Sequence, residues 1–150
     1  MSLFERFMEK AFLDRPGGGF IIKVHEMGQE LVTRYAGLRG LPPAYLDRID
    51  QWALGVYLFG LANGLGNKEN IPPIELETAM DDVLASLFGY DAATAQRYVA
   101  TWIQDLLTGD PRNVNYSIIR QAAGAYTLWK KGNQGAVAAA VLTIANQQRR

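Results

Sequence analysis

The chain contains no cysteine and a single histidine, His25. Without cysteine there is no disulfide framework, no thiolate nucleophile and no cysteine-ligated zinc or iron–sulfur site. The Glu-x-x-His pair expected from helices of a di-iron bundle does not occur, and neither does the phosphate-loop pattern G-x-x-x-x-G-K-[ST]. These absences exclude several metal, redox and nucleotide chemistries.

Two kinds of segment are also missing. No stretch of strict apolar–polar alternation is longer than about four residues, so strands are not expected. No apolar run reaches the roughly 20 residues that cross a bilayer. Met1–Asp14 lacks the basic start, long apolar run and small-residue cleavage site of a signal peptide, which predicts a cytoplasmic protein.

The composition is that of one folded domain. The 150 residues are 49% hydrophobic and 20% charged, enough apolar side chains for a core without covalent staples. We expect a single all-helical domain over residues 1–150. Pro16-Gly17-Gly18-Gly19 predicts a flexible point at residues 16–19, because proline and repeated glycine interrupt helices.

Trp52 to Gly66 carries only one polar side chain, Asn63, and four glycines. A surface helix needs polar residues along its outer face, so this stretch is predicted to be a central helix covered on all sides. Its glycines, including Gly55, Gly60 and Gly64, would let neighbouring helices approach closely. A small-molecule- or lipid-binding bundle, the main alternative, would need a cavity around these glycines.

Apolar residues at three- and four-residue intervals predict an all-α fold, a bundle of six to seven helices. The expected helices cover residues 4–12, 20–38, 43–64, 74–88, 92–107, 111–131 and 134–148. Asp91 is predicted to cap the fifth, Asp110-Pro111 to start the sixth, and Gly64–Pro73 to form the longest loop. The stripe Phe4-Met8-Phe12 would support self-association as a homodimer.

No group of residues identifies an active site. His25 lies beside Glu26 and one helical turn from Glu30, but no partner nucleophile accompanies them. The pairs Asp47-Asp50 and Glu75-Glu77 stand at predicted helix starts, where carboxylates offset the helix dipole. We therefore expect no catalytic residues, no bound metal and no cofactor.

Charge is distributed unevenly although 15 basic and 15 acidic residues cancel. Six acids and no lysine or arginine lie between Glu69 and Asp91, whereas six basic residues and no acid follow Asp110. A sequence pI of about 6.6 is well below the value of about 9 typical of nucleic-acid-binding domains, so a nucleic-acid-associated regulator is disfavoured. The asymmetry favours a protein partner attracted by charge.

The region Pro43 to Lys131 resembles the small, all-helical cytoplasmic immunity proteins of bacterial toxin–immunity systems. The resemblance lies in the glycine-rich helix, an acidic helix beginning Pro73-Ile74-Glu75, a Gly89-Tyr90 corner, and two later helices bearing Trp102 and Trp129. It implies a non-catalytic protein that binds a cognate toxin and blocks its active site. Unlike the strongly acidic nuclease-inhibiting members of that group, this chain is neutral overall.

The acidic helix is the predicted partner-binding surface. Its four acids lie within eight residues, on the side opposite its apolar stripe. They are Glu75, Glu77, Asp81 and Asp82. A carboxylate-rich helix can occupy the basic cleft of a nucleic-acid-degrading toxin as a phosphate mimic. The other surfaces to consider are the basic C-terminal helices and the Gly64–Pro73 loop.

Overall fold

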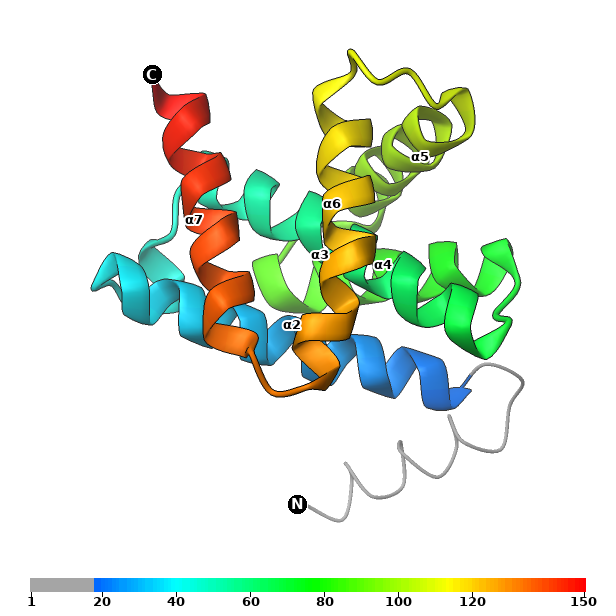
Figure 1. Cartoon of the computed structure of the whole chain (residues 1–150), viewed down its shortest axis with the longest axis horizontal. Helices are drawn as coiled ribbons and strands as arrows, with labels where there is room; N and C mark the ends of the chain where they lie inside the picture. Colours follow the sequence, from blue (N-terminus) through cyan, green and yellow to red (C-terminus); the bar gives the residue numbers. More distant parts are fainter. Residues whose placement is uncertain (1–17) are drawn as a thin grey trace.

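Six α-helices and one short 3-10 helix cover most of residues 18–150, the part of the chain that this computed structural model describes (Figure 1). They are α2 (Gly18–Arg39), η1 (Pro43–Tyr45), α3 (Arg48–Glu69), α4 (Pro73–Phe88), α5 (Ala92–Thr108), α6 (Val114–Lys130) and α7 (Gln134–Arg149). The all-α prediction is confirmed, and these residues contain no strand.

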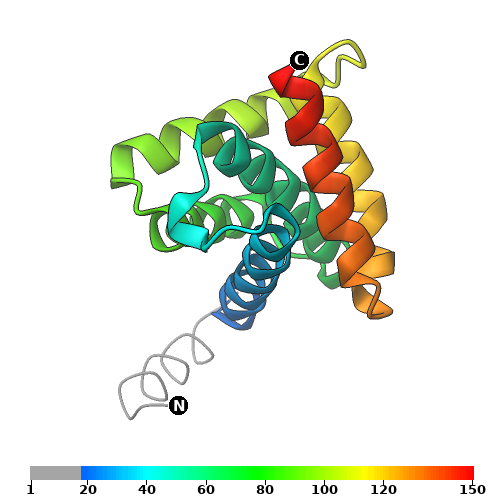
Figure 2. The same ribbon diagram turned by 90° about the vertical axis from the view of Figure 1, so that its left-hand side faces the viewer.

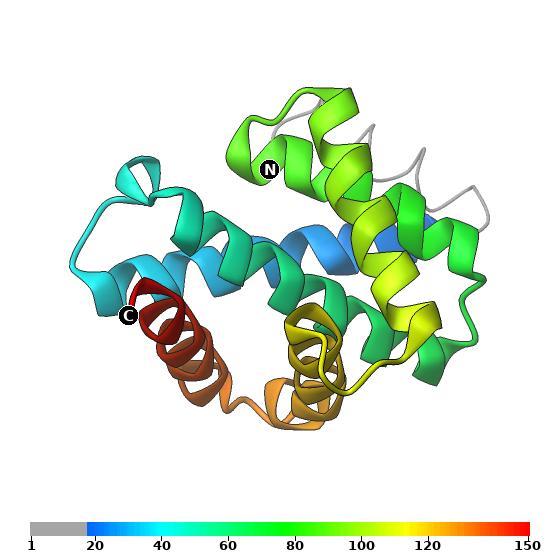
Figure 3. The same cartoon turned by 90° about the horizontal axis from the view of Figure 1, so that it is seen from above.

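The helices form two pairs around α2 and α3. Figures 2 and 3 show the antiparallel α6–α7 pair on one side of α2 and α3, and the α4–α5 pair on the other. Helix α3 contacts every other α-helix of the described chain, and 13 of its 22 residues are buried. Leu58, near its middle, is only 1% exposed.

Glycines let helices pack closely against α3, as predicted. A Cβ atom built on Gly60 would lie 2.4 Å from the Cβ of Ala122 and 2.7 Å from the carbonyl oxygen of Ile119, both on α6. A Cβ on Gly55 would lie 2.8 Å from the Trp102 ring of α5. The space beside these two glycines is therefore filled by protein and holds no ligand cavity, whereas Gly64 lines a hollow of about 490 Å³ beside α6.

The predicted start of α3 at Pro43 is wrong. Pro43–Tyr45 forms a single 3-10 turn, and the α-helix begins after Asp47. Asp47 accepts a hydrogen bond from the Asp50 amide at 2.9 Å, and Asp50 accepts one from the Asp47 amide at 3.0 Å. This capping box satisfies free amides at the helix start, and nothing equivalent is available at Pro43.

The predicted loop from Gly64 to Pro73 is also largely wrong, because α3 continues to Glu69 and only residues 70–72 connect it to α4. Gly64 lies against the α6 backbone, where a Cβ would be 2.7 Å from the Ala123 carbonyl oxygen. This packing favours the helix despite the low helical propensity of glycine. Asn70 ends α3 in the left-handed conformation, with φ of 56°.

The start of α6 differs from the prediction in a similar way. Asn113 caps the helix by accepting from the Tyr116 amide at 2.9 Å. Asp110, the predicted start, instead accepts from the Arg112 amide within the preceding turn. Asp91 does cap α5 as predicted, accepting from the Thr94 amide at 2.7 Å.

Two other predictions concern residues that lie wholly or partly outside the described part of the chain. The helix over residues 4–12, with the Phe4-Met8-Phe12 stripe, lies outside them. Of the flexible point at 16–19, residues 16 and 17 also lie outside, and α2 begins at Gly18. None of the helices found between residues 18 and 150 is both long enough and apolar enough to span a bilayer.

Candidate partner-binding surface

Helix α4 carries the predicted acidic surface and packs its other side against the bundle. Leu76, Met80, Val83 and Leu84 are buried, as expected. Ile74, which was also predicted to point inward, is 71% exposed. At about 100° per residue it lies nearly opposite the centre of the buried stripe, so the helix geometry leaves it in solvent.

The four predicted acids flank this buried stripe in two pairs. Glu75 and Asp82, seven residues apart, lie on one edge of α4, and Glu77 and Asp81, four apart, lie on the other. Glu77 and Asp82 are exposed, while Glu75 and Asp81 are partly buried. The exposed side of α4 therefore has a carboxylate along each edge rather than one compact cluster.

Asp82 is engaged with α2. Its Oδ2 lies 2.9 Å from Nε2 of His25, and the two side chains are 57% and 25% exposed, respectively. This contact joins α2 to α4 and gives the only histidine a structural partner. Among residues 18–150 no group of three or more histidine or carboxylate side chains is arranged to hold a metal ion.

Asp81, unlike Asp82, pairs with no basic side chain among residues 18–150. Its Oδ1 is buried and has no hydrogen-bond partner within the described residues. Burial, and the negative charge of Glu77 one turn away, raise the pKa of Asp81. The folded protein therefore disfavours the ionised form of this carboxylate, and a cationic or hydrogen-bonding group from a partner would relieve that cost.

Replacing Asp81 by asparagine should stabilise the free protein. Because the pKa of Asp81 is raised by folding, its ionised form destabilises the fold above its unfolded pKa, and at pH 7 the neutral amide removes this penalty. We expect the free energy of unfolding to rise by about 0.5–1 kcal/mol, measured by denaturant unfolding.

The neighbouring Asp82→Asn substitution is the matched control. It weakens the contact with His25, so it should leave stability unchanged or lower it. Equal stabilisation by both substitutions would contradict a specific penalty at Asp81.

The most strongly perturbed carboxylate lies elsewhere, at the start of α3. Asp50 is fully buried and accepts hydrogen bonds from the Tyr35 hydroxyl of α2 and from Nη2 of Arg149 of α7, the latter at 2.8 Å. Arg39 of α2 donates through Nη2 at 3.4 Å; its Nε lies 3.3 Å from the same carboxylate but makes no hydrogen bond. Arg149 also donates to Asp47 at 3.0 Å.

Burial would raise the pKa of Asp50, but the bonds from Tyr35, Arg149 and the Asp47 amide outweigh it and lower the pKa to about 2. Burial and the adjacent carboxylate raise the pKa of Tyr35, so its hydroxyl stays protonated and can donate. Asp47 and Asp50 are predicted from the sequence to stand at a helix start, but no pattern in the sequence indicates this network. The cluster ties three helices together around a carboxylate that is not exposed to solvent.

A comparison with known protein families shows which family the chain belongs to. The sequence model of the immunity protein 48 family matches residues 32–148, well over half of the chain. The chain belongs to this immunity protein family. No curated protein and no solved structure gives a match.

Family membership confirms the resemblance to immunity proteins that the sequence predicted. The matched residues include the whole of α3 to α6 and all four acids of α4. They also include Asp50, whereas His25 and the first half of α2 precede the match. The immunity protein 48 match therefore covers the predicted acidic surface but not the α2 partner of Asp82.

Proposed function

We propose that this chain neutralises a cognate bacterial toxin in the cytoplasm by binding it, without catalysis. The observation that carries the proposal is the immunity protein 48 match over residues 32–148. The ionisable groups of the described residues fit a binding role. The one histidine is paired with Asp82, and the buried Asp50 is surrounded by donors that hold three helices together.

The acidic side of α4 supports the choice of contact surface. Glu75, Glu77 and Asp81 make no ion pair with residues 18–150, so their charge is available to a partner. The Asp81 side chain is partly exposed and carries this charge, although its Oδ1, which has no hydrogen-bond partner among residues 18–150, is itself buried. A toxin with a basic nucleic-acid-binding cleft would pair with these carboxylates and lose access to its substrate.

Co-expression tests the proposal directly. A candidate toxin domain, chosen from a toxin-like reading frame adjacent to the gene, would be induced in a sensitive host with or without this chain. We expect growth only when the chain is present, together with a stoichiometric complex of the purified proteins. Continued killing in the presence of the folded chain, or rescue without a complex, would contradict neutralisation by binding.

Neutralising the α4 acids should slow association with that toxin domain. The double variant Glu77→Gln and Asp81→Asn removes two negative charges without breaking a described ion pair. We expect about tenfold slower association at low salt, because charge steering accelerates encounter and is screened over about 8–10 Å at physiological ionic strength. Stopped-flow measurements across a salt series would show the difference shrinking as salt is added.

A control variant with the same change in net charge separates the local effect of the α4 carboxylates from the effect of the protein's total charge. Gln104→Lys on α5 and Gln147→Lys on α7 add two positive charges at exposed positions. The control should associate at a rate much closer to that of the unaltered protein. Equal slowing by both double variants would mean that only net charge matters, and no slowing by either would remove α4 from the interface.

A further inference from the structure

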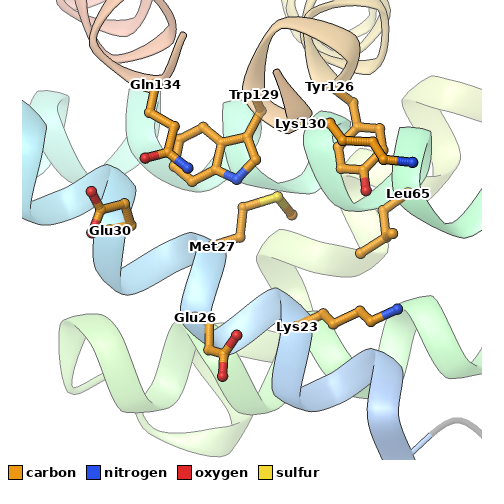
Figure 4. A pocket seen from close by; sticks show the side chains of 9 residues that line it. All are labelled: Lys23, Glu26, Met27, Glu30, Leu65, Tyr126, Trp129, Lys130 and Gln134. Atoms are coloured by element: carbon orange, nitrogen blue, oxygen red, sulfur yellow. The ribbon is translucent and has the colours of Figure 1, made fainter. Parts of the chain in front are cut away.

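A groove separate from the acidic side of α4 lies where the α6–α7 turn crosses α2 and α3. Figure 4 shows side chains from all four helices around it, and its volume is about 560 Å³. Met27, Leu65 and Trp129 close its floor and are nearly buried in the core, with Trp129 9% exposed, whereas Tyr126 is half-buried. Tryptophan and tyrosine at a concave site are the residue types that most often anchor protein partners.

One end of the groove is basic. Lys23 and Lys130 line it, and a second hollow of about 490 Å³ adjoins it, sharing Tyr126 and Lys130. Lys68 and Lys131 also line this second hollow, and none of its lining residues is acidic. The nearby Lys130 lowers the pKa of Lys68, so the two ammonium groups are close enough to repel each other.

The other end is acidic. Glu26 and Glu30 of α2 line it, on the side of Met27 and Trp129 away from Lys130 (Figure 4). Glu30 pairs with Arg34 at 2.6 Å, and Lys23 pairs with Glu69. Within residues 18–150, Glu26 and the three lysines at positions 68, 130 and 131 make no ion pair. Both ends therefore present unpaired charge of opposite sign.

Helix ends explain part of this pattern. Lys68 lies in the last turn of α3 and Lys130 in the last turn of α6, where positive charge offsets the helix dipole. That stabilisation needs only a lysine at each helix end. It does not require the two lysines to converge on one hollow, or an aromatic floor leading to glutamates at the far end.

We propose that this groove binds a segment of a protein partner that presents an acidic, a large apolar and a basic side chain in succession. The acidic side chain would meet the lysines, the apolar one would pack against Tyr126 and the exposed edge of Trp129, and the basic one would meet Glu26. A nucleic acid strand fits less well, because its phosphates would be repelled by Glu26 and Glu30. The inference rests on the proposed function in taking the partner to be a protein.

The groove and the Glu75–Asp82 edge of α4 both lie along α2. On α2, His25 contacts α4, Glu26 and Gln29 lie on the exposed side, and Met27 faces the groove. A protein lying across the exposed side of α2 would therefore reach the groove and the Glu75–Asp82 edge of α4, whereas Glu77 and Asp81 lie on the far edge of that helix. Glu26 and Glu30 precede the family match at residue 32, whereas Trp129 and Lys130 fall within it.

Peptide titration tests the groove without any toxin. The probes are the capped peptide Asp-Asp-Gly-Leu-Phe-Gly-Lys-Lys, its reverse sequence, and a control with Ser-Ser in place of Leu-Phe. With ¹⁵N-labelled full-length protein, we expect one of the first two peptides to shift the Trp129 indole and Lys130 amide signals, with a Kd on the order of 1 mM. Lys130→Glu should weaken this response at least fivefold, whereas Arg112→Glu, on a side chain that is 91% exposed and away from the groove, should not.

The absence of a Trp129 shift at several times that concentration, or equal shifts from the serine control, would overturn the groove as a binding site. With the toxin domain, the double variant Glu26→Lys and Lys130→Glu keeps the net charge and should lower affinity about tenfold. Unchanged affinity would also overturn the groove, while leaving the proposed function intact. If the unaltered protein does not bind the toxin domain, the proposed function fails and the peptide titration alone decides the groove.

Discussion

Replacing Asp50 by alanine should lower the free energy of unfolding at pH 7 by about 3–5 kcal/mol, because removing one partner of a buried ion pair leaves the others unsatisfied. Arg149, Tyr35 and Arg39 converge on this one carboxylate from two other helices. The substitution also removes the acceptor for the Asp47 amide at the start of α3. Denaturant unfolding at equilibrium measures the loss.

Asp110→Ala is the control for this effect. Asp110 also pairs with an arginine, Arg112, but the pair is on the surface, with side chains 37% and 91% exposed. Exposed pairs contribute about 0–1 kcal/mol, so this variant should unfold nearly like the unaltered protein. Similar losses from the two substitutions would show that burial does not set the strength of the Asp50 network.

The pH dependence provides a second measurement of the same network. Folding lowers the pKa of Asp50 from an ordinary value near 3.8 to about 2. The stabilisation linked to its ionisation, about 2 kcal/mol, is therefore complete above about pH 4 and is lost as the pH falls towards 2. The difference in stability between the unaltered protein and Asp50→Ala should narrow over that interval, and a constant difference would contradict the lowered pKa.

The sequence predicted the helices well where the local signal and the tertiary structure agree. Asp91 is a good capping residue followed by an amphipathic stripe, and α5 begins there. The errors at Pro43, Gly64 and Asp110 share a cause. In each case a proline, glycine or aspartate carries a local signal that another interaction overrides: a better cap a few residues further along at Asp47–Asp50 and at Asn113, and tertiary packing on α6 at Gly64.

The sequence predicts less of the candidate binding surfaces than of the fold. The acids of α4 could be located because they cluster along the chain, but their division into two edges and the contact of Asp82 with His25 depend on how α4 meets α2. The groove and the adjoining hollow bring Lys23, Lys68 and Lys130 together from three helices, and no spacing in the sequence relates them. Similarly, Arg149 and Asp50 are 99 residues apart.

Leu58→Ala should lower the free energy of unfolding by about 2–5 kcal/mol, through lost burial and the cavity left behind. Leu58 is 1% exposed, and its methyl group lies close to Gly28, where a built Cβ would be 3.0 Å away. The neighbouring helix backbone at Gly28 cannot move in without disturbing the contacts of α2 with α4 and α7, so the cavity should collapse only partly.

The matched control is Leu107→Ala near the end of α5, where the side chain is 76% exposed and the expected change is within about 0.5 kcal/mol. Thermal and denaturant unfolding of both variants would show whether the cost follows burial. A loss at Leu58 as small as that at Leu107 would contradict the position of α3 at the centre of the bundle. A large loss at Leu58 alone would show that close packing around α3 maintains the arrangement on which both proposed binding surfaces depend.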